Sequence, residues 1–410
     1  MGTGRMVLVG GGRAAAAAAV TLRREGFDGE VVVVGEEPHP PYERPPLSKG
    51  WAAPPSVEDL LLRERDWYAD NDVRLLTGVR AEHLDVADRR LRLSDGGTLG
   101  YDRLLLATGG RPRRLPGVTS ERVRHLRTLD DARALQELAA SGEALVVLGG
   151  GFVGCEVAAA ARAAGVDVTV LEMQPTLLRR ALDPQLGELV ADVHRSRGVT
   201  VRTGERVESV EEIAGGLLVR TDRAVLECSA LLVAIGMQRA TELLDGTPVA
   251  CDDGVLVDEH AETSVPGVFA AGDVAATWEP RLGRRLRLEH DDNAAKQGAV
   301  AARNMLGATA VHDAPHWFWS DQYEHSLQMV GLPDGHDEVV LRGSPEERSF
   351  CVFWLQAGHV VAMLAFDRGR ELVTGRKLVA ARAAVSAAQL KDESVELRRL
   401  LPRPRREGAS

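Results

Sequence analysis

The sequence predicts an α/β protein that contains two βαβ units of one type, followed by a smaller α+β domain. Two glycine-rich segments support the first part of this prediction, at residues 7–15 and 146–154. Each follows a short apolar run and precedes an alanine-rich stretch, which is the strand–turn–helix setting of a dinucleotide-binding turn. Beyond residue 315 the sequence becomes richer in aromatic residues and contains alternating apolar runs such as 349–355. These runs predict strands, and a helix is expected after them at about 373–390.

Both glycine-rich turns have the residues that bring a backbone close to a pyrophosphate. The first glycine allows a tight turn, the second lets phosphates approach, and a small third residue lets the helix pack on the strand. These positions are Gly10, Gly12 and Ala15 in the first turn, and Gly149, Gly151 and Gly154 in the second. Phosphates then sit at a helix N-terminus, which favours negative charge. Two Rossmann-type sites in one chain imply two dinucleotides and electron transfer between them.

An acidic residue follows each turn at the end of the next predicted strand. Glu36 and Glu172 lie roughly 20 residues past their turns, where a carboxylate accepts a hydrogen bond from an adenosine ribose. Because a carboxylate repels a 2′-phosphate, Glu172 predicts that the second site prefers NADH over NADPH.

Composition argues against several other classes of protein. The net charge of −10 disfavours general nucleic-acid binding, and no apolar run reaches the length of a membrane span. The four cysteines are scattered, without a C-x-x-C pair or a cluster with histidine, which argues against a metal site and a redox disulfide. The first predicted strand begins too early for a signal peptide, so we expect a cytoplasmic protein.

Three predicted strands end in small or acidic residues. The first unit closes at Thr108-Gly109, its repeat closes at Gly236, and a later buried strand ends in Gly272-Asp273. Open α/β sheets bind ligands at this carboxyl edge. Asp273 could there accept hydrogen bonds from a polyhydroxyl chain such as ribitol, or cap the next segment.

The segment Tyr42-Glu43-Arg44-Pro45-Pro46-Leu47-Ser48-Lys49 matches a Y-x-R-P-P-L-S-K signature. Together with Gly272-Asp273 and Trp319-Ser320-Asp321-Gln322, it resembles the NADH-dependent FAD ferredoxin reductases of Rieske-type oxygenase and haem monooxygenase systems. The resemblance extends nearly end to end. It implies a glutathione-reductase-like fold with a split FAD domain at 1–111 and 238–314, an NAD domain at 112–237, a C-terminal domain at 315–401 that covers the flavin, and a basic tail at 402–410.

The resemblance also implies the residues that contact the cofactors. For FAD they are Gly10, Gly12, Ala14 and Ala15 at the pyrophosphate, Glu36 at the ribose, Ala81 at the adenine, Arg44 and Lys49 toward phosphate and flavin, Arg127 near the flavin and Asp273 at the ribitol, together with Thr108, Gly109, Gly272, Glu289, His290 and Asp291. For NADH they are Gly149, Gly151, Phe152, Val153 and Gly154 in the turn, Glu172 and Arg180 at the adenosine, and Glu156 and Gly236 near the nicotinamide.

Lys49, Glu156 and Trp319 are the expected catalytic residues. A lysine near flavin N5 favours the electron density that arrives with a hydride, and Glu156 would anchor its ammonium while Trp319 stacks near the flavin. Without the resemblance, Glu156 is better explained as a carboxylate at a helix N-terminus. The implied reaction passes hydride from NADH to FAD, after which electrons leave one at a time.

One position departs from the family pattern. Asp291 stands in the E-x-W-x-N-A region, where the family has an aromatic or apolar residue. The helix expected from Asn293 to about Met305 should aim its N-terminus at the flavin, so a carboxylate there would oppose negative charge on the reduced flavin and lower its potential. This effect disappears if Asp291 turns toward Arg287 or solvent.

The electron acceptor is left open, because the apoptosis-inducing flavoprotein shares these motifs. The candidate functions are a reductase for a ferredoxin-type iron–sulfur protein, an FAD enzyme that acts directly on a small molecule, and a non-enzymatic flavoprotein that senses NADH. Ferredoxins are usually acidic, as this chain is, so docking requires a local basic patch. The candidate patch is Arg281, Arg284, Arg285 and Arg287, although a solvated loop explains it equally well. A monomer and a homodimer both fit the sequence.

Overall fold

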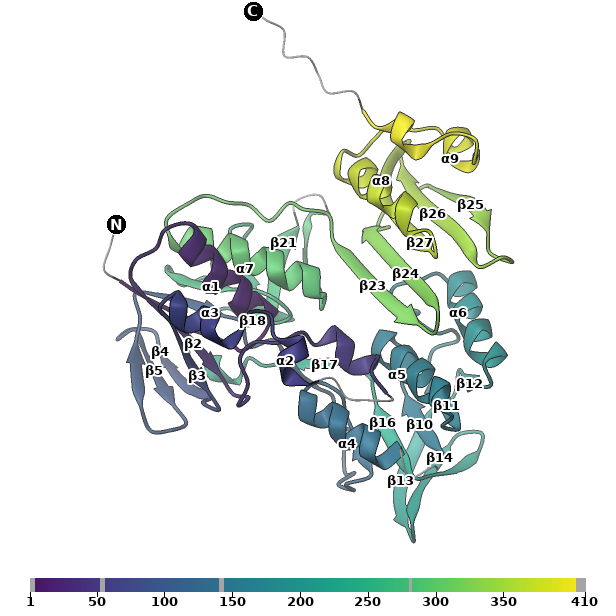
Figure 1. Ribbon diagram of the computed structural model, residues 1–410, viewed down its shortest axis with the longest axis horizontal. Helices are drawn as coiled ribbons and strands as arrows, with labels where there is room; N and C mark the ends of the chain where they lie inside the picture. The colour runs from purple at the N-terminus through teal and green to yellow at the C-terminus, as the bar shows by residue number, and fades with distance from the viewer. Residues whose placement is uncertain (1–3, 52–55, 140–143, 280–281, 403–410) are drawn as a thin grey trace, which may run out of the picture. The chain divides into compact units, whose positions relative to one another are not determined.

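The computed structural model describes residues 4–51, 56–139, 144–279 and 282–402 (Figure 1). The chain divides into two units, one up to His312 and one from Asp313 onward, which we call the N-terminal unit and the C-terminal unit. Across the described ranges, no helix combines the length and apolar character that crossing a bilayer requires.

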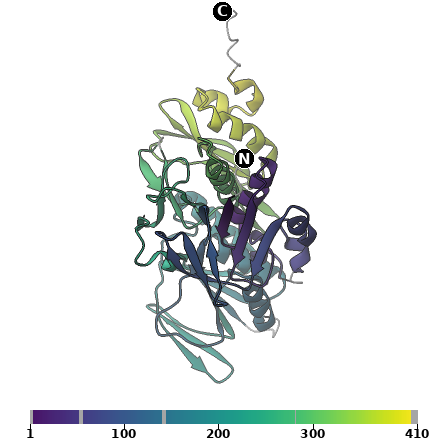
Figure 2. The same cartoon turned by 90° about the vertical axis from the view of Figure 1, so that its left-hand side faces the viewer.

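A parallel five-stranded sheet in the order β20-β7-β1-β2-β3 begins the N-terminal unit. Its strands are β1 (Arg5–Val9), β2 (Glu30–Gly35), β3 (Val73–Thr77), β7 (Arg103–Leu106) and β20 (Val268–Ala270), and Figure 2 shows the purple strands side by side. The central strands are apolar and buried on both faces, as in parallel sheets that are covered on both sides. Strand β20 comes late in the chain, yet Val268 pairs with Leu104. The sheet is therefore assembled from two separated parts of the sequence.

Two helices pack together on one face of this sheet. They are α1 (Arg13–Arg24) and α7 (Asp291–Met305), which lie side by side in Figure 1. Small residues allow the close approach, because a Cβ added at Gly298 of α7 would lie 2.2 Å from the carbonyl oxygen of Ala14. Residues of both helices share one apolar core with Leu8 and Val33 of the sheet. As a result, the N-termini of α1 and α7 are held at the same edge.

Antiparallel strands contribute to the apolar core on the opposite face. They form a sheet of β4 (Ala81–Asp85), β5 (Arg90–Leu93) and β6 (Thr98–Gly100), and a sheet of β18 (Cys251–Asp252), β19 (Gly254–Val257), β21 (Ala275–Glu279) and β22 (Arg284–Leu286), in which β19 and β21 are parallel. The remaining short elements here are α2 (Val57–Leu60), α3 (Arg65–Asp70) and the 3-10 helices η1 (Pro45–Ser48) and η2 (Glu242–Leu244).

A second parallel sheet repeats the design, in the order β12-β11-β10-β16-β9. Its strands are β9 (Val123–Arg124), β10 (Leu145–Leu148), β11 (Val168–Glu172), β12 (Thr200–Thr203) and β16 (Ala230–Val233), accompanied by α4 (Leu129–Ala139), α5 (Phe152–Ala163) and α6 (Pro184–Ser196). An antiparallel sheet of β13 (Val207–Ile213), β14 (Gly216–Thr221) and β15 (Val225–Cys228) follows β12. The chain passes from the first parallel sheet to the second and back through two short strands, β8 (Gly110–Pro112) and β17 (Met237–Arg239), which pair with each other.

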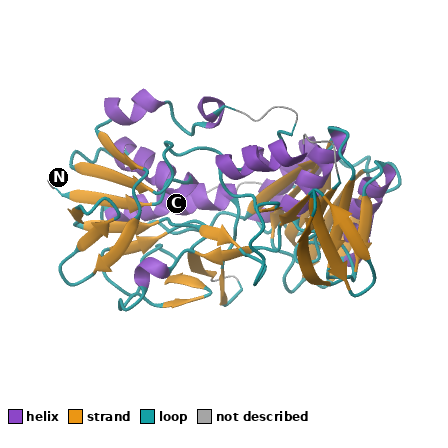
Figure 3. Cartoon of the chain, turned by 90° about the horizontal axis from the view of Figure 1, so that it is seen from below, coloured by secondary structure: helices purple, strands orange, loops and turns teal. Residues whose placement is uncertain are grey.

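The C-terminal unit has a five-stranded antiparallel sheet in the order β23-β24-β27-β26-β25, and Figure 3 distinguishes its strands and helices by colour. The elements are β23 (Trp317–Gln322), β24 (His325–Gly331), β25 (Glu338–Ser344), β26 (Ser349–Gln356), β27 (His359–Phe366), α8 (Gly369–Ala380), α9 (Ala387–Lys391) and η3 (Leu397–Leu400). The single helix expected at 373–390 is wrong in extent. Ala384 bridges to His359, and Ser386 forms a capping box with Gln389 that starts a new helix.

Candidate functional site

The two glycine turns have the same local geometry. Gly10 has φ +135°, and an added Cβ there would lie 2.0 Å from the carbonyl oxygen of Ala107. Gly149 has φ +113°, and its added Cβ would lie 2.4 Å from the carbonyl oxygen of Ala234. These glycines are therefore required by the fold itself.

The second glycine of each turn is different, because its surroundings are open. Gly12 and Gly151 are the N-cap residues of α1 and α5, and an added Cβ would meet no atom within 4 Å at either position. Both backbones thus leave room at a helix N-terminus, where N–H groups favour an anion. This open backbone fits the pyrophosphate of a dinucleotide at each turn.

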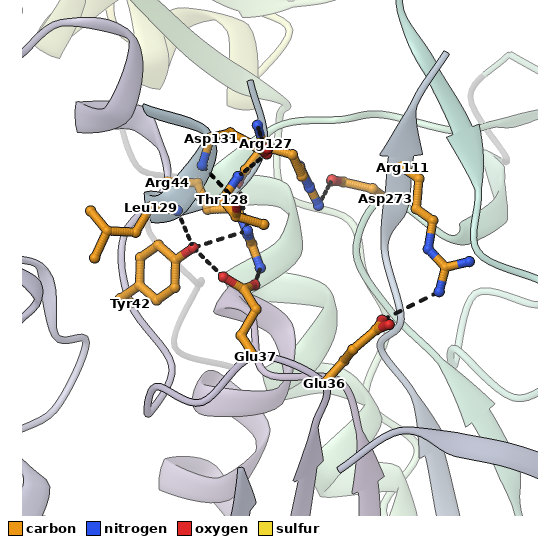
Figure 4. A network of polar contacts seen from close by, with 10 residues as sticks. All are labelled: Glu36, Glu37, Tyr42, Arg44, Arg111, Arg127, Thr128, Leu129, Asp131 and Asp273. Carbon is orange, nitrogen blue, oxygen red and sulfur yellow. Dashed lines mark hydrogen bonds and ion pairs between the residues drawn. The ribbon is translucent and has the colours of Figure 1, made fainter. Parts of the chain in front are cut away.

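The acids that follow the turns are held differently. The Glu172 carboxylate accepts hydrogen bonds from the backbone N–H of Gly150 at 2.6 Å and of Gln174 at 2.7 Å, so it lies against the second turn. Glu36 instead forms ion pairs with Arg111 at 3.3 Å and Arg80 at 3.7 Å, and Figure 4 shows its side chain extended toward Arg111. A carboxylate has about four acceptor positions, so both acids retain capacity for ribose hydroxyls.

The Y-x-R-P-P-L-S-K segment is anchored by a polar network that the sequence did not reveal (Figure 4). The hydroxyl of Tyr42 donates to Glu37 at 2.5 Å, and Arg44 forms an ion pair with the same carboxylate at 2.7 Å. Arg44 also donates to the carbonyl of Arg127 at 2.7 Å. Burial, together with the neighbouring Glu37, raises the pKa of Tyr42 above its usual range even though Arg44 lowers it. Arg44 therefore joins the signature segment to Glu37 and to the backbone of Arg127. Its contact with a phosphate stays a prediction.

Three of the expected FAD residues meet at the carboxyl edge of the first sheet. Arg127 forms an ion pair with Asp273 at 3.0 Å (Figure 4), and its guanidinium lies 2.9 Å from where a Cβ on Gly109 would stand. Backbone N–H groups of Arg127 and Thr128 donate to Asp131 at 3.0 and 2.8 Å, which fixes this segment at the start of α4. The structure thus brings together residues that are far apart in the sequence.

The expected pair of Lys49 and Glu156 links the two halves of the N-terminal unit. Lys49 Nζ lies 3.9 Å from Glu156 Oε1, which is near the outer limit of an ion pair. Lys49 follows η1, and Glu156 lies in the first turns of α5, where its side chain is only 8% exposed. Ser48 donates a hydrogen bond to the same carboxylate. Sequence reasoning missed this role of Ser48, although the residue belongs to the quoted signature.

Asp291 faces Arg13 rather than Arg287 or solvent. Arg13 Nε lies 2.9 and 2.8 Å from the two carboxylate oxygens of Asp291, and Arg13 Nη2 lies 2.9 Å from Glu43. The Asp291 side chain is 17% exposed, and its burial raises its pKa although Arg13 lowers it. Helix α7 begins at Asp291, two residues earlier than expected, with His290 as its N-cap.

The basic segment is only partly available at the surface. Arg284 and Arg285 are exposed on β22, and Arg285 also donates to the carbonyl of Ala276 at 3.1 Å. Arg287 has a side chain that is 14% exposed and lies 2.5 Å from Glu289. Arg281 falls outside the described residues.

The other expected residues lie as follows. Arg180 lies 3.6 Å from where a Cβ on Gly236 would stand, at the carboxyl end of β16. Val153 is an exposed apolar residue at the start of α5. Ala81, an expected FAD residue, is the first residue of β4 and follows Arg80. Trp319 belongs to the C-terminal unit, where it stacks on Trp317 with ring centroids 4.9 Å apart, so its place near a flavin stays a prediction.

A metal site is not evident in the described ranges, and the thiol beside the second turn is buried. No group of three or more His, Cys, Asp or Glu residues in those ranges is arranged to hold a metal ion. Cys155, beside the second turn, is fully buried, and this burial raises the pKa of its thiol. It therefore serves as a small packed residue.

Comparisons with known proteins identify similar chains and families. The family model described as pyridine nucleotide-disulphide oxidoreductase matches residues 4–298, and the reductase C-terminal model matches residues 317–401. The ferredoxin–NAD(+) reductase component of the anthranilate 1,2-dioxygenase system from Burkholderia cepacia is 38% identical over 400 residues, covering 96% of this chain and 98% of that protein.

Two solved structures are similar along almost the whole chain. The ferredoxin reductase of the CYP199A2 system from Rhodopseudomonas palustris has a TM-score of 0.93 at 32% identity, covering 97% of this chain and all of that one. The reductase in a covalent putidaredoxin reductase–putidaredoxin complex has a TM-score of 0.93 at 35% identity, covering 98% of both chains.

Proposed function

Because this chain belongs to the pyridine nucleotide-disulphide oxidoreductase family, and within it to the ferredoxin–NAD(+) reductases, we propose that it passes electrons from NADH through FAD to a ferredoxin-type iron–sulfur protein. The resemblance found in the sequence and the glutathione-reductase-like fold class are confirmed. The chain is an FAD-dependent NAD(P)H oxidoreductase.

The observation that carries the proposal is the contact between the signature segment and the helix that follows the second turn. The signature segment that follows β2 reaches the first turns of α5, where Lys49 and Ser48 contact Glu156. When bound, FAD supplies the hydride acceptor and the one-electron donor that side chains lack. In this proposal the protein holds one dinucleotide at each turn, and Lys49 and Glu156 stand between the two.

We propose the same cofactor residues that the sequence indicated, with specific roles for the ion pairs. Arg127 orients Asp273 toward the ribitol, and Glu36 accepts from the ribose between its two arginines. Glu156, held by Ser48, keeps the Lys49 ammonium in place for a negative charge that develops at the flavin.

We assign the FAD domain to residues 1–111 and 238–314, the NAD domain to 112–237, the C-terminal domain to 315–401 and the tail to 402–410. The pairing of β20 with β7 supports the split FAD domain. The paired crossings β8 and β17 lie at the two proposed boundaries of the NAD domain. We also propose a cytoplasmic location, which the four free cysteines support.

A steady-state comparison of acceptors tests the function. NADH oxidation is measured with a [2Fe–2S] ferredoxin, a quinone, oxygen and a dye under otherwise equal conditions. We expect rapid turnover with the ferredoxin and slow turnover with oxygen or quinone. Equal turnover with every acceptor would favour direct action on a small molecule, and flavin reduction without turnover would favour an NADH sensor.

Coenzyme preference follows from Glu172. We expect kcat/KM for NADH to exceed that for NADPH by at least about tenfold, roughly 1.4 kcal/mol, because the carboxylate accepts from the ribose and repels a 2′-phosphate. Glu172→Ala should narrow this ratio and leave the FAD content unchanged. Because Glu172 also accepts from two backbone N–H groups, Glu172→Gln is the matched control for the fold. Equal efficiency of the wild type with both coenzymes would refute the assignment.

Partner docking is proposed at the exposed arginines of β22. The double substitution Arg284→Glu and Arg285→Glu should slow ferredoxin reduction, most strongly at low salt, while dye reduction by NADH stays normal. Arg90→Glu with Arg92→Glu on the exposed side of β5 changes the net charge equally and serves as the control. If both double variants slow the ferredoxin equally, the effect comes from net charge and the docking site lies elsewhere.

A further inference from the structure

One ion-pair network at the first turn has no counterpart in the expectations from sequence. It joins Arg13, the first residue of α1, to Asp291, the first residue of α7, and to Glu43 of the signature segment. The contacts with Asp291 are the more buried, because the side chains of Asp291 and Glu43 are 17% and 45% exposed.

The packing of the two helices makes this pairing possible. Gly298 of α7 lies directly against the backbone of Ala14, and a Cβ on Gly272 would stand 3.3 Å from Ala14 and 3.5 Å from Ala294. The N-termini of α1 and α7 therefore stand next to each other at the carboxyl edge of the first sheet, the edge at which such sheets bind ligands. Arg13 spans the gap between them.

The two other carboxylates near Asp291, those of Asp273 and Asp292, have cationic partners of their own. Asp273 has Arg127 at 3.0 Å, and Asp292 has Lys296 at 2.5 Å. Asp291 is thus balanced by Arg13, and a guanidinium at the N-terminus of α1 opposes the helix dipole unless a carboxylate accompanies it. Arg13 offsets the charge of Asp291, which is the more buried of the two carboxylates that accompany this guanidinium.

We propose that Arg13 is a positioning residue of the FAD site that neutralises Asp291 and so removes its effect on the reduction potential of the flavin. The inference rests on the proposed function, which places FAD over the turn at residues 10–15. It replaces the expectation that Asp291 alone lowers the flavin potential.

A double-mutant cycle tests the pair through the midpoint potential of the bound flavin. Asp291→Asn removes one negative charge and leaves Arg13 paired only with the more exposed Glu43, which stabilises the reduced flavin and raises the midpoint. Arg13→Gln leaves the Asp291 charge unbalanced and lowers it. We expect each single change to alter the equilibrium constant of the two-electron reduction by at least tenfold, about 30 mV, and the double variant to return close to the wild type.

Spectroelectrochemical titration in mildly alkaline buffer, which keeps Asp291 ionised, gives these midpoints. Arg13→Lys preserves the charge and should leave the midpoint near that of the wild type, and this variant also serves if Arg13→Gln fails to fold. Shifts of both single variants in the same direction, or no shift in either, would overturn the inference while leaving the proposed function intact. A wild-type protein that binds no FAD would overturn both.

Discussion

Replacing Gly12 with valine is expected to weaken FAD binding by at least about a hundredfold, roughly 2.8 kcal/mol, while the apoprotein still folds. A Cβ added at Gly12 meets no protein atom within 4 Å, so we expect the valine side chain to enter the space that we assign to the pyrophosphate. The backbone at Gly12 has φ −110° and ψ −169°, which valine adopts readily. The measurements are the dissociation constant of FAD and the thermal unfolding of the apoprotein, which loses about 1 kcal/mol at most from the weaker helix cap.

Two matched variants separate the cofactor effect from the fold. Gly151→Val makes the same change in the second turn and should retain FAD while weakening NADH binding, because that position is equally open. Gly10→Val should instead destabilise the apoprotein, since its Cβ would overlap the carbonyl oxygen of Ala107 at 2.0 Å. A Gly12→Val protein that keeps wild-type affinity for FAD would show that the pyrophosphate lies elsewhere.

Removal of the Lys49 ammonium is expected to slow reduction of the flavin by NADH by about 100-fold or more, the size typical for loss of one preorganised charge at a reacting centre. The readout is the single-turnover rate in an anaerobic stopped-flow experiment with Lys49→Met, at saturating NADH. Lys49→Arg keeps the charge and should recover part of the rate.

The neighbours of Lys49 supply the controls. Ser48→Ala removes a hydrogen bond to Glu156 but no charge, so we expect a smaller loss of rate than in Lys49→Met. Glu156→Gln should slow reduction through the loss of an anchor for the ammonium. FAD content and thermal unfolding are measured for each variant. A Lys49→Met protein with an unchanged limiting rate and a higher KM alone would limit the lysine to binding.

The parts of the fold that follow from local chemistry could be predicted from the sequence. The turns at Gly10 and Gly149 require a positive φ and a close backbone contact, so their glycines carried a specific signal. The second strand of the second unit ends at Glu172 as expected, whereas that of the first unit ends at Gly35, directly before Glu36. These local patterns indicated two dinucleotides and a preference for NADH, whereas FAD and the ferredoxin acceptor came from the family resemblance.

Contacts between distant segments could not be predicted in this way. Neither periodicity nor spacing relates Arg13 to Asp291 across 278 positions, and their pairing depends on how closely α1 packs on α7. The same holds for Ser48 with Glu156, and even the short-range contact of Tyr42 with Glu37 depends on the path of the signature segment. The helix expected at 373–390 was wrong because the cap at Ser386 signals a second start inside an apolar pattern.

An anaerobic titration of the enzyme and an excess of a [2Fe–2S] ferredoxin with NADH tests the central claim most directly. A hydride carries two electrons, and a [2Fe–2S] centre accepts one, so the account predicts two reduced ferredoxins for each NADH consumed, with no ferredoxin reduction when FAD has been removed. Consumption of NADH that leaves the ferredoxin oxidised, or ferredoxin reduction by the FAD-free protein, would contradict it.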